Sequence, residues 1–352
     1  MPPRLTVVLA AALVSAEVAR AQAPTVQFDI AIGCADCGTT LQFSAIREVA
    51  VQPDGSLLVA DRDAPTLRAF DASGKPTWST GRTGMGPGEY QFVLRASATA
   101  SGAVAVLDLG GMRVTELGPT HSVVSTTGLQ GFPTTAATDG HGGFVIGAEG
   151  PGGRVTFSAY RAGRVSALSF PAPPSGDDGR AFRQASVAAG AHGTIAILPH
   201  YERYLIMRFD SGGRRLPDIT RDIPRVRRSA AEEAEFRRRA GRAMAMVKAE
   251  LGAAGGKPGS SVGPVIPEAE RGLKPHVATD GMRYDPSGRL WVRTMRGDEK
   301  ATVFDVFGAS GAFLGSVTVE GRMDTFAVGD GWLVTTRETE DGVPQVVRWR
   351  VR

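Results

Sequence analysis

The chain has 352 residues, of which 45 are glycine, 42% are hydrophobic and 22% are charged, and its formal net charge is +4. A chain of this length can bury a large core in one domain, because closed β architectures often exceed the usual domain size. Its basic residues are scattered among 36 acidic ones, which excludes the concentrated basic footprint of a nucleic-acid-binding protein.

The first 23 residues have the pattern of a signal peptide. Arg4 supplies a positive start, the run LTVVLAAALV is apolar, and small residues from Ala19 to Ala23 provide a cleavage site. We therefore expect export to the periplasm or the extracellular space of a bacterium, with an uncleaved anchor as the alternative. No later segment offers about 20 uninterrupted apolar residues, so we expect no transmembrane segment. The cleavage site has no cysteine, which argues against lipid attachment.

The only two cysteines, Cys34 and Cys37, follow shortly after this leader. In an oxidising compartment a Cys-x-x-Cys pair most often closes as a local disulfide, which here would pin the strand that enters the fold. A redox-active dithiol and a zinc site are the alternatives. Both are less favoured, because the pair does not begin a helix in a βαβ unit and the histidines lack finger-like spacing.

A repeated unit begins at Ile46 and recurs along almost the whole chain. Each copy contains a strand, a turn centred on glycine, a second apolar strand, and then a third and a fourth strand. The turns fall at Asp54-Gly55, Ser101-Gly102, Gly142-Gly143, His192-Gly193, Ser287-Gly288 and Asp330-Gly331. Four antiparallel strands make one blade of a β-propeller, so six turns predict an all-β, six-bladed propeller over residues 24–352.

The sixth unit has no fourth strand of its own, because its third strand runs to Arg352. The segment TVQFDIA from Thr25 has strand character and belongs to no other blade. We therefore expect this N-terminal strand to complete the sixth blade and close the ring, which leaves no open blade edge. An open sandwich or two smaller β domains is the alternative.

The repeat is interrupted between the fourth and fifth units, over residues 225–280. Ser229 and Glu232 form a capping box, and apolar residues from Phe236 to Leu251 share one face, which predicts an amphipathic helix ending near Gly252. This insertion joins the outer strand of one blade to the inner strand of the next, so we expect it on the face of the loops between second and third strands. A lid over the channel and a structural element on the rim are the two interpretations. Membrane association is less favoured, because the apolar face is small.

Polar residues near the start of the inner strands are expected around the same channel mouth. They are Arg47, Glu48, Arg95, Gln184, Arg283 and Asp324, and His276 stands at the end of the insertion. The loop residues Arg62, Asp63, His200, Tyr201, Glu202, Arg296 and Asp298 are expected to surround them. Several arginines around one channel favour a small anionic or carboxylate-bearing ligand, and the alternative is that these strand ends are only solvated. No nucleophile elbow, zincin helix or phosphate loop is present, so we assign no catalytic residue, no metal site and no cofactor.

The first unit resembles an NHL-type repeat. The resemblance covers VAVQPDGSLLVADRDAPTLRAFDASGKPTWSTGRTGMGPGEY, including the run from Gly86 to Tyr90, and it extends to YDPSGRLWVRT from Tyr284 to Thr294. In overall plan the chain is similar to six-bladed NHL/TolB-like propellers of secreted bacterial proteins. This resemblance implies a fold and not an activity.

Gluconolactonases and amidating lyases are six-bladed relatives that hold a metal in the channel. This chain has Glu48, Asp285 and Asp324 on inner strands but not the recognisable ligand set of those enzymes. We therefore expect a monomeric, exported binding module for a small anionic ligand or an envelope protein, acting through its channel mouth and insertion-bearing face. A metal-dependent hydrolase or lyase and a purely structural envelope protein are the alternatives.

Overall fold

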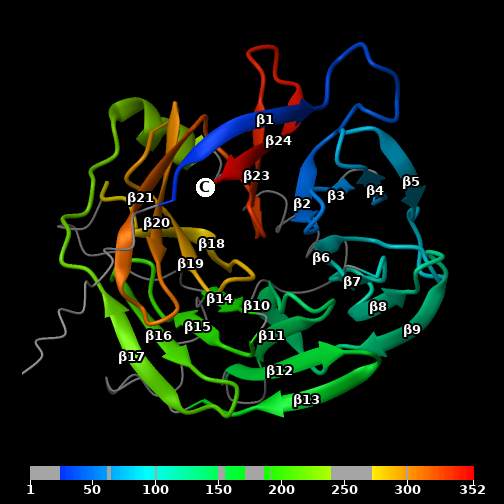
Figure 1. The fold of residues 1–352 in the computed structure, drawn as a ribbon, viewed down its shortest axis with the longest axis horizontal. Helices are drawn as coiled ribbons and strands as arrows, with labels where there is room; N and C mark the ends of the chain where they lie inside the picture. Colours follow the sequence, from blue (N-terminus) through cyan, green and yellow to red (C-terminus); the bar gives the residue numbers. More distant parts are fainter. Residues whose placement is uncertain are drawn as a thin grey trace, which may run out of the picture.

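The fold is a ring of six four-stranded antiparallel sheets around a central channel (Figure 1). A computed structural model describes residues 24–61, 65–99, 101–149, 155–170, 186–190, 192–238, 272–298 and 300–352. Each sheet is one blade, with its first strand next to the channel and its last strand at the rim. The six-bladed propeller predicted from the glycine turns is confirmed.

The blades follow one another in chain order. Blade 1 contains β2 (Ile46–Val51), β3 (Leu57–Asp61), β4 (Leu67–Phe70) and β5 (Pro76–Thr80), and blade 2 contains β6 (Val93–Ala98), β7 (Val104–Asp108), β8 (Arg113–Leu117) and β9 (Val123–Gly128). Blade 3 contains β10 (Phe132–Thr138), β11 (Phe144–Glu149), β12 (Val155–Arg161) and β13 (Arg164–Leu168), and blade 4 contains β14 (Ser186–Ala189), β15 (Ile195–Leu198), β16 (Leu205–Phe209) and β17 (Arg215–Thr220). Blade 5 contains β18 (Val277–Tyr284), β19 (Leu290–Thr294), β20 (Ala301–Phe307) and β21 (Phe313–Glu320), and blade 6 contains β22 (Phe326–Gly329), β23 (Trp332–Glu338), β24 (Pro344–Val351) and β1 (Val26–Ile32).

The turn between the first two strands of each blade has glycine where the backbone needs it. Gly55 has φ +84° and its amide bonds to the carbonyl of Gln52, a conformation that residues with a Cβ rarely adopt. The corresponding glycines with positive φ in the other blades are Gly102, Gly142, Gly193, Gly288 and Gly331. These turns set the register in which the apolar second strands pair.

The N-terminal strand closes the ring, as predicted. β1 pairs antiparallel with β24, from Val26 opposite Val351 to Ile32 opposite Val346. A bulge between Phe28 and Ile30 turns out Asp29, which accepts hydrogen bonds from Arg348 Nε at 2.8 Å and Arg350 Nε at 2.9 Å. Just beyond β1, Cys34 and Cys37 are joined by a disulfide.

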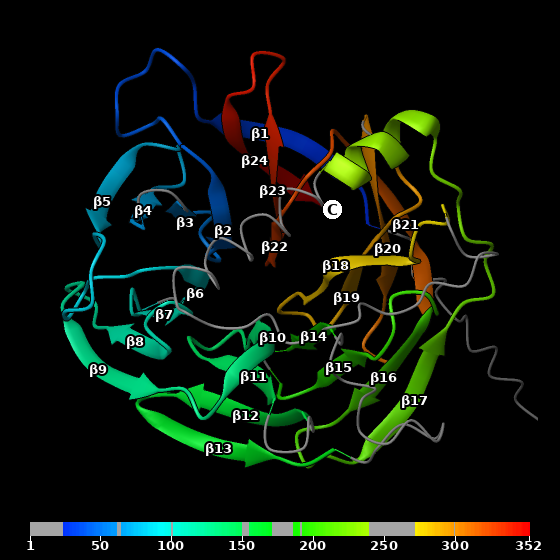
Figure 2. The same ribbon diagram turned by 180° about the vertical axis from the view of Figure 1, so that it is seen from behind.

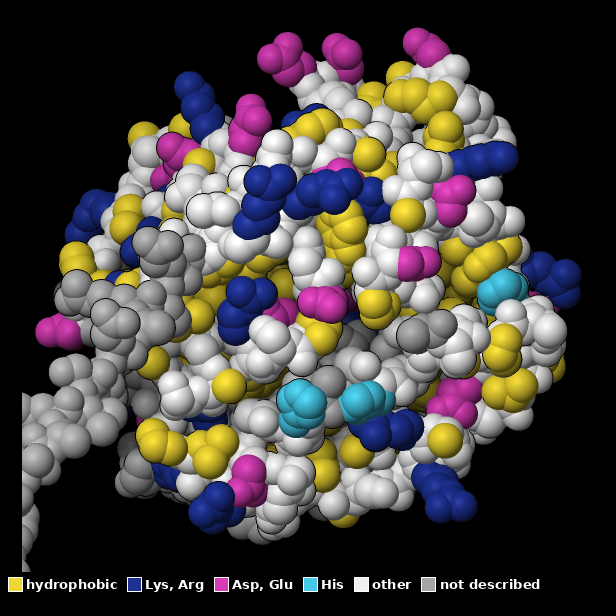
Figure 3. Space-filling model, in the orientation of Figure 1, with side chains coloured by type: hydrophobic (Ala, Val, Ile, Leu, Met, Phe, Trp, Pro, Cys, Tyr) yellow, Lys and Arg dark blue, Asp and Glu magenta, His cyan; other side chains and the backbone are white. Residues whose placement is uncertain are grey.

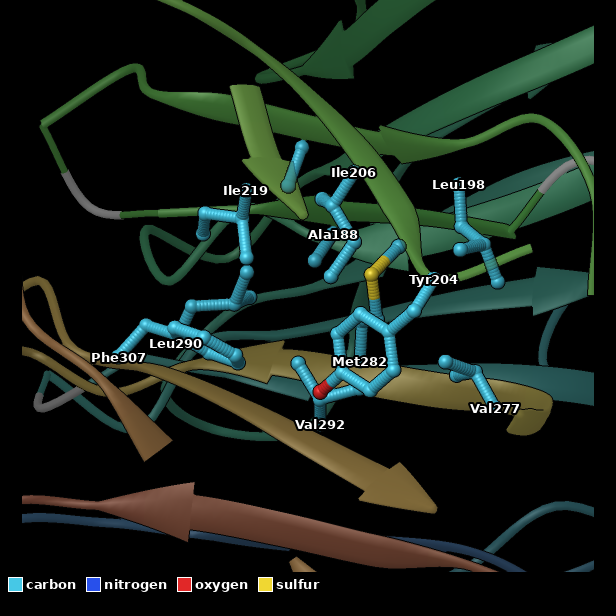
Figure 4. Close-up of a cluster of buried hydrophobic side chains, with 11 residues drawn as sticks. Ala188, Leu198, Tyr204, Ile206, Ile219, Val277, Met282, Leu290, Val292 and Phe307 are labelled. Carbon is cyan, nitrogen blue, oxygen red and sulfur yellow. The ribbon is translucent and has the colours of Figure 1, made fainter. Parts of the chain in front are cut away.

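Apolar side chains fill the wedges between neighbouring blades. The wedge between blades 4 and 5 is shown in Figure 4, where Ile206 and Tyr204 face Met282 and Val292 across the gap. All four are at most 4% exposed. Burying such side chains contributes about 1.5–3 kcal/mol each relative to leaving them in water, which holds successive blades at a fixed angle around the channel.

The insertion leaves blade 4 after β17 and returns to begin β18. Its two ends pair as a short neck, in which Arg227 and Leu273 form an antiparallel bridge and Lys274 N bonds to Val226 O at 2.7 Å. A helix spans residues 230–238 of the described chain and lies on the near face in Figure 2. The predicted cap is confirmed, since Ser229 N donates to Glu232 Oε2 at 2.8 Å and Glu232 N donates to Ser229 Oγ at 3.2 Å.

Much of the predicted helix lies outside the described residues. This applies to the apolar positions from Ala240 to Leu251 and to the stop at Gly252. Within the described part, Phe236 is 47% exposed, and the guanidinium of Arg228 lies 4.1 Å from the centre of its ring. The signal peptide at residues 1–23 also lies outside the described residues.

Candidate functional site

The inner strands carry buried polar residues at one register position. Glu48, Arg95, Thr135 and Ser186 occupy equivalent places opposite the second strands of blades 1 to 4. Each is at most 8% exposed. In β2, β6 and β10 a bulge directly precedes this position. Bulges redirect the following side chains, which here brings charged and hydroxyl groups together at the channel.

An ionic network crosses the channel at this level. Arg95 of blade 2 donates to Glu48 of blade 1, with Nη1 2.9 Å from Oε2, and its Nη2 pairs with Asp280 of blade 5. Blades 2 and 5 stand on opposite sides of the ring (Figure 1), so the second pair bridges the channel. Arg95 also donates to the carbonyls of Ala136 and Leu94, which fixes the plane of its guanidinium.

Asp280 is the member of the network that the sequence reasoning missed. It has φ +58°, a left-handed conformation that is uncommon outside glycine but tolerated by aspartate, and it lies within the irregular stretch of β18 between Val277 and Met282. Arg283 Nη1 holds this turn by donating to Asp280 O at 3.1 Å and Met282 O at 2.9 Å. The sequence feature that could have identified Asp280 is the Asp280-Gly281 pair inside an otherwise strand-like run.

Burial lowers the pKa values of the two arginines of the network, Arg95 and Arg283. Burial lowers the pKa of Arg95 to about 10, Glu48 opposes this change, and the positive charges of Arg283 and Arg47 add to it. Burial likewise lowers the pKa of Arg283, and Glu48 opposes that change. Arg95 therefore stays protonated at neutral pH, and it pairs with both carboxylates of the network, Glu48 and Asp280.

The insertion-bearing face has two adjoining cavities, which we call the helix cavity and the rim cavity. The helix cavity has a volume of about 400 Å³ and lies between the helix and blades 5 and 6. The rim cavity has a volume of about 630 Å³ and lies between blades 6 and 1. Arg322 and Asp324, both exposed, border the two cavities together.

A buried lysine anchors the helix over its cavity. Lys274 is 6% exposed, and its Nζ lies 2.5 Å from Glu232 Oε1 and 3.0 Å from Gly297 O of blade 5. Burial would raise the pKa of Glu232, but hydrogen bonds from Lys274 and from the Ser229 amide outweigh it and lower the pKa. The helix start is therefore tied to the propeller through a charged contact.

A third cavity, the channel cavity, opens on the opposite face. It has a volume of about 370 Å³, and Glu48 and Arg283 are among the residues that line it. The inner strands of all six blades form its wall, and it reaches the turns at Pro53, His141 and Asp330. Figure 3 shows that face, with charged and histidine side chains lying around its centre.

The predicted site residues are therefore divided among several places. Glu48, Arg95 and Arg283 meet in the ionic network. Arg47 lies beside Phe92, with its guanidinium 4.9 Å from the ring centre. Asp324 borders the two insertion-side cavities. The ring of His276 lies 6.0 Å from that of Tyr204, and burial together with the charges of Arg225 and Arg296 lowers its pKa.

The loop residues predicted around the mouth are also dispersed. Asp298 lines the helix cavity. Arg296 donates to Ser316 and pairs with the buried Asp305 of blade 5. Tyr201 accepts a main-chain bond from His276 at 2.8 Å. Arg62, Asp63 and Gln184 lie outside the described residues.

The carboxylates considered as metal ligands do not converge. Glu48 is engaged by Arg95, whereas Asp285 caps its own turn and accepts from Arg289 at 2.6 Å and Trp291 at 3.2 Å. Within the described ranges, no group of three or more histidine, cysteine, aspartate and glutamate side chains is arranged to hold a metal ion. In the same part of the chain, no helix is long and apolar enough to cross a membrane.

Comparison with solved structures places the chain in the class of six-bladed β-propellers. A Bacteroides fragilis protein predicted to be exported superposes with a TM-score of 0.57 at 11% identity, over 93% of this chain and 95% of that one. A member of the duf4221 family from Bacteroides vulgatus gives a TM-score of 0.50 at 9% identity, over 93% and 98%. Calcium-binding regucalcin from Agrobacterium tumefaciens gives 0.44 at 11% identity, over 92% and 96%, which is too distant to bear on function.

These similarities define the fold alone. No family model matches the chain, and no curated protein matches it significantly. Function must therefore be argued from the side chains of the two faces.

Proposed function

We propose that this protein is an exported binding module whose insertion-bearing face holds an extended, polar segment of another exported protein. The observation that carries the proposal is the pair of adjoining cavities that share Arg322 and Asp324 beneath the anchored helix. Two neighbouring cavities suit an elongated ligand better than a compact one. The capped and anchored helix supplies one wall in advance, which reduces the ordering cost of binding.

The charges of the two cavities favour a segment that carries both signs. Arg293 contributes to the helix cavity, where it donates to the carbonyls of Met323, Asp324 and Thr279, while its buried Nε has no hydrogen-bond partner among the described residues. A carboxylate of the ligand would pair with the exposed guanidinium of Arg322, which borders both cavities. The rim cavity has a surplus of acidic side chains, including the exposed Glu338 and Glu340, which favours lysine or arginine of the ligand.

Export is supported by three independent features. The first 23 residues have the composition of a cleavable leader, and the cysteines next to β1 form a disulfide, a bond typical of oxidising compartments. The superposed Bacteroides fragilis protein is itself predicted to be exported. A partner in the same compartment follows from this location.

The proposal can be tested with fluorescent peptides of about 12 residues, grouped as acidic, basic and mixed-charge sets. We expect mixed-charge peptides to bind about tenfold more tightly than the other sets, measured by anisotropy at fixed ionic strength. The charge reversals Arg322→Glu and Glu338→Lys should each weaken binding. Asp210→Asn, in an exposed turn of blade 4, is the matched control. Equal binding by all sets, or by wild type and both reversals, would disprove the proposal.

A further inference from the structure

The inner strands have a second register level, which lies two residues further along each strand than the level of Glu48 and Arg95. The equivalent residues of the six inner strands at this level are Ala50, Ser97, Ala137, Ala188, Arg283 and Ala327. All six line the channel cavity. Five of them are small, which leaves space for the cavity in the middle of the ring.

Arg283 is the single large side chain at this level. It is 7% exposed, and its Nη1 is satisfied by the carbonyls of Asp280 and Met282. Its Nη2 lies 3.8 Å from Glu48 Oε1, which is longer than a hydrogen bond. Glu48 is meanwhile held at 2.9 Å by Arg95. The guanidinium of Arg283 therefore borders the cavity with one terminal nitrogen incompletely satisfied.

The carboxylates that line the channel cavity are Glu48, Asp285 and Asp330, and Arg283 is the only arginine or lysine among its described lining residues. Glu48 is held by Arg95 and Asp285 by Arg289, whereas Asp330 is exposed at a turn. Arg283 is therefore a buried cation of this wall that no carboxylate holds at hydrogen-bond distance. Arginine is suited to carboxylate because its planar fork can donate two parallel hydrogen bonds.

We propose that the channel cavity is a binding site for a small monocarboxylic acid with an apolar body, which enters from the face opposite the insertion. The carboxylate pairs with Arg283 at the inner end, and the body lies against the alanine and valine side chains of the wall, among them Ala50, Val51 and Ala98. A volume of about 370 Å³ is at the lower end of the range of small-molecule sites, so the ligand is limited to a short chain or one ring. This site is separate from the insertion-side cavities of the proposed function.

The test uses the full exported protein and three probes of one shape: hexanoate, hexanamide and hexylamine. Isothermal titration calorimetry should show hexanoate binding at least about tenfold more tightly than the other two. Arg283→Met should abolish this preference. Because that change also removes a network member, Ala50→Leu provides a second variant, which fills the cavity from the wall and should weaken hexanoate binding with an unchanged melting temperature.

Three outcomes would overturn the proposal. The first is tighter binding of hexylamine, since Glu48 would then control the site, and the second is no binding of any probe at millimolar concentration. The third is hexanoate binding that survives Ala50→Leu but is lost in the insertion-side variant Arg322→Glu, which would locate the probe on the other face. Retained hexanoate binding in Arg322→Glu is expected, so this proposal and the peptide-binding proposal can fail independently.

Discussion

Arg95 and Asp280 form an ion pair between two blades that face each other across the ring. The side chain of Arg95 is 4% exposed and that of Asp280 is 35% exposed, so the pair runs from the buried channel wall toward solvent. Neighbouring blades are already joined by apolar wedges, but this contact connects positions separated by 185 residues of chain. It opposes independent movement of the two halves of the ring.

Removing this carboxylate should destabilise the fold. We expect Asp280→Ala to lower the free energy of unfolding by about 2 kcal/mol, because Arg95 stays buried with Glu48 as its one remaining carboxylate partner and alanine disfavours the left-handed backbone. Asp280→Gly should cost less, since glycine accepts φ +58° without strain. Urea denaturation measures both variants. Equal midpoints for Asp280→Ala and wild type would show that the pair contributes nothing to stability.

Loss of the closing strand should destabilise the whole ring. Deletion of residues 25–31 removes most of β1 and exposes the edge of β24, so we expect a lower and less cooperative thermal transition. Differential scanning calorimetry compares the thermal transition of the deletion variant with that of wild type. A cooperative transition at the wild-type temperature would contradict closure by this strand.

Stability at acid pH should depend on Asp29. Burial tends to raise its pKa, but hydrogen bonds and charges from Arg348 and Arg350 outweigh burial and lower the pKa below 3.8. The stabilisation by Asp29 is therefore complete above the pKa of this group in the unfolded chain, near pH 4. It is lost as the pH falls through the lower pKa of the folded protein. Asp29→Asn should reduce stability at pH 7 and flatten the change between pH 4 and pH 2. If the free energy of unfolding changes with pH equally in Asp29→Asn and in wild type, the acid transition belongs to other carboxylates.

His276 should make stability fall between pH 7 and pH 5. Burial, followed by the charges of Arg225 and Arg296, lowers its folded pKa below the usual 6.5. The unfolded chain thus takes up a proton first, and the contribution of His276 is full above pH 6.5 and lost as the pH falls through the folded pKa. The melting temperature of His276→Gln should differ less between pH 7.5 and pH 5.5 than that of wild type. An unchanged difference would exclude His276 as its source.

The helix of the insertion should loosen when its anchor is removed. Lys274→Met deletes the contacts to Glu232 and Gly297, so we expect faster amide hydrogen exchange over residues 230–238. Ser229→Ala removes the cap without touching the anchor, and a loss of about 1 kcal/mol of helix stability is expected. Exchange in β19 should stay slow in both variants. Unchanged exchange over the helix in Lys274→Met would show that the anchor is dispensable.

The ring could be predicted because its signals are local and repeated. Gly55 and its five counterparts mark turns that require positive φ, and an unpaired strand at Val26 must find an edge. The capping box at Ser229 and Glu232 was likewise readable from spacing alone. Such features depend on backbone conformation within a few residues.

The candidate sites were only partly predictable, because they depend on register across the ring. Sequence placed Glu48, Arg95 and Asp324 at one mouth, whereas the structure lets Glu48 line the channel cavity and puts Asp324 on the opposite face. Bulges in the inner strands change which residues point inward, and they leave no clear trace in hydrophobic pattern. Asp280 was missed for the same reason.

The pairing of β1 with β24 also determines when the fold can be completed. The first strand must wait for Val346 to Val351 before it has a partner, so one blade edge remains open while the chain is being made. Contacts of such long sequence separation form late and slowly. The last blade therefore assembles only after β24 has been made, and until then a chaperone that binds exposed strand edges would protect the open edge from aggregation.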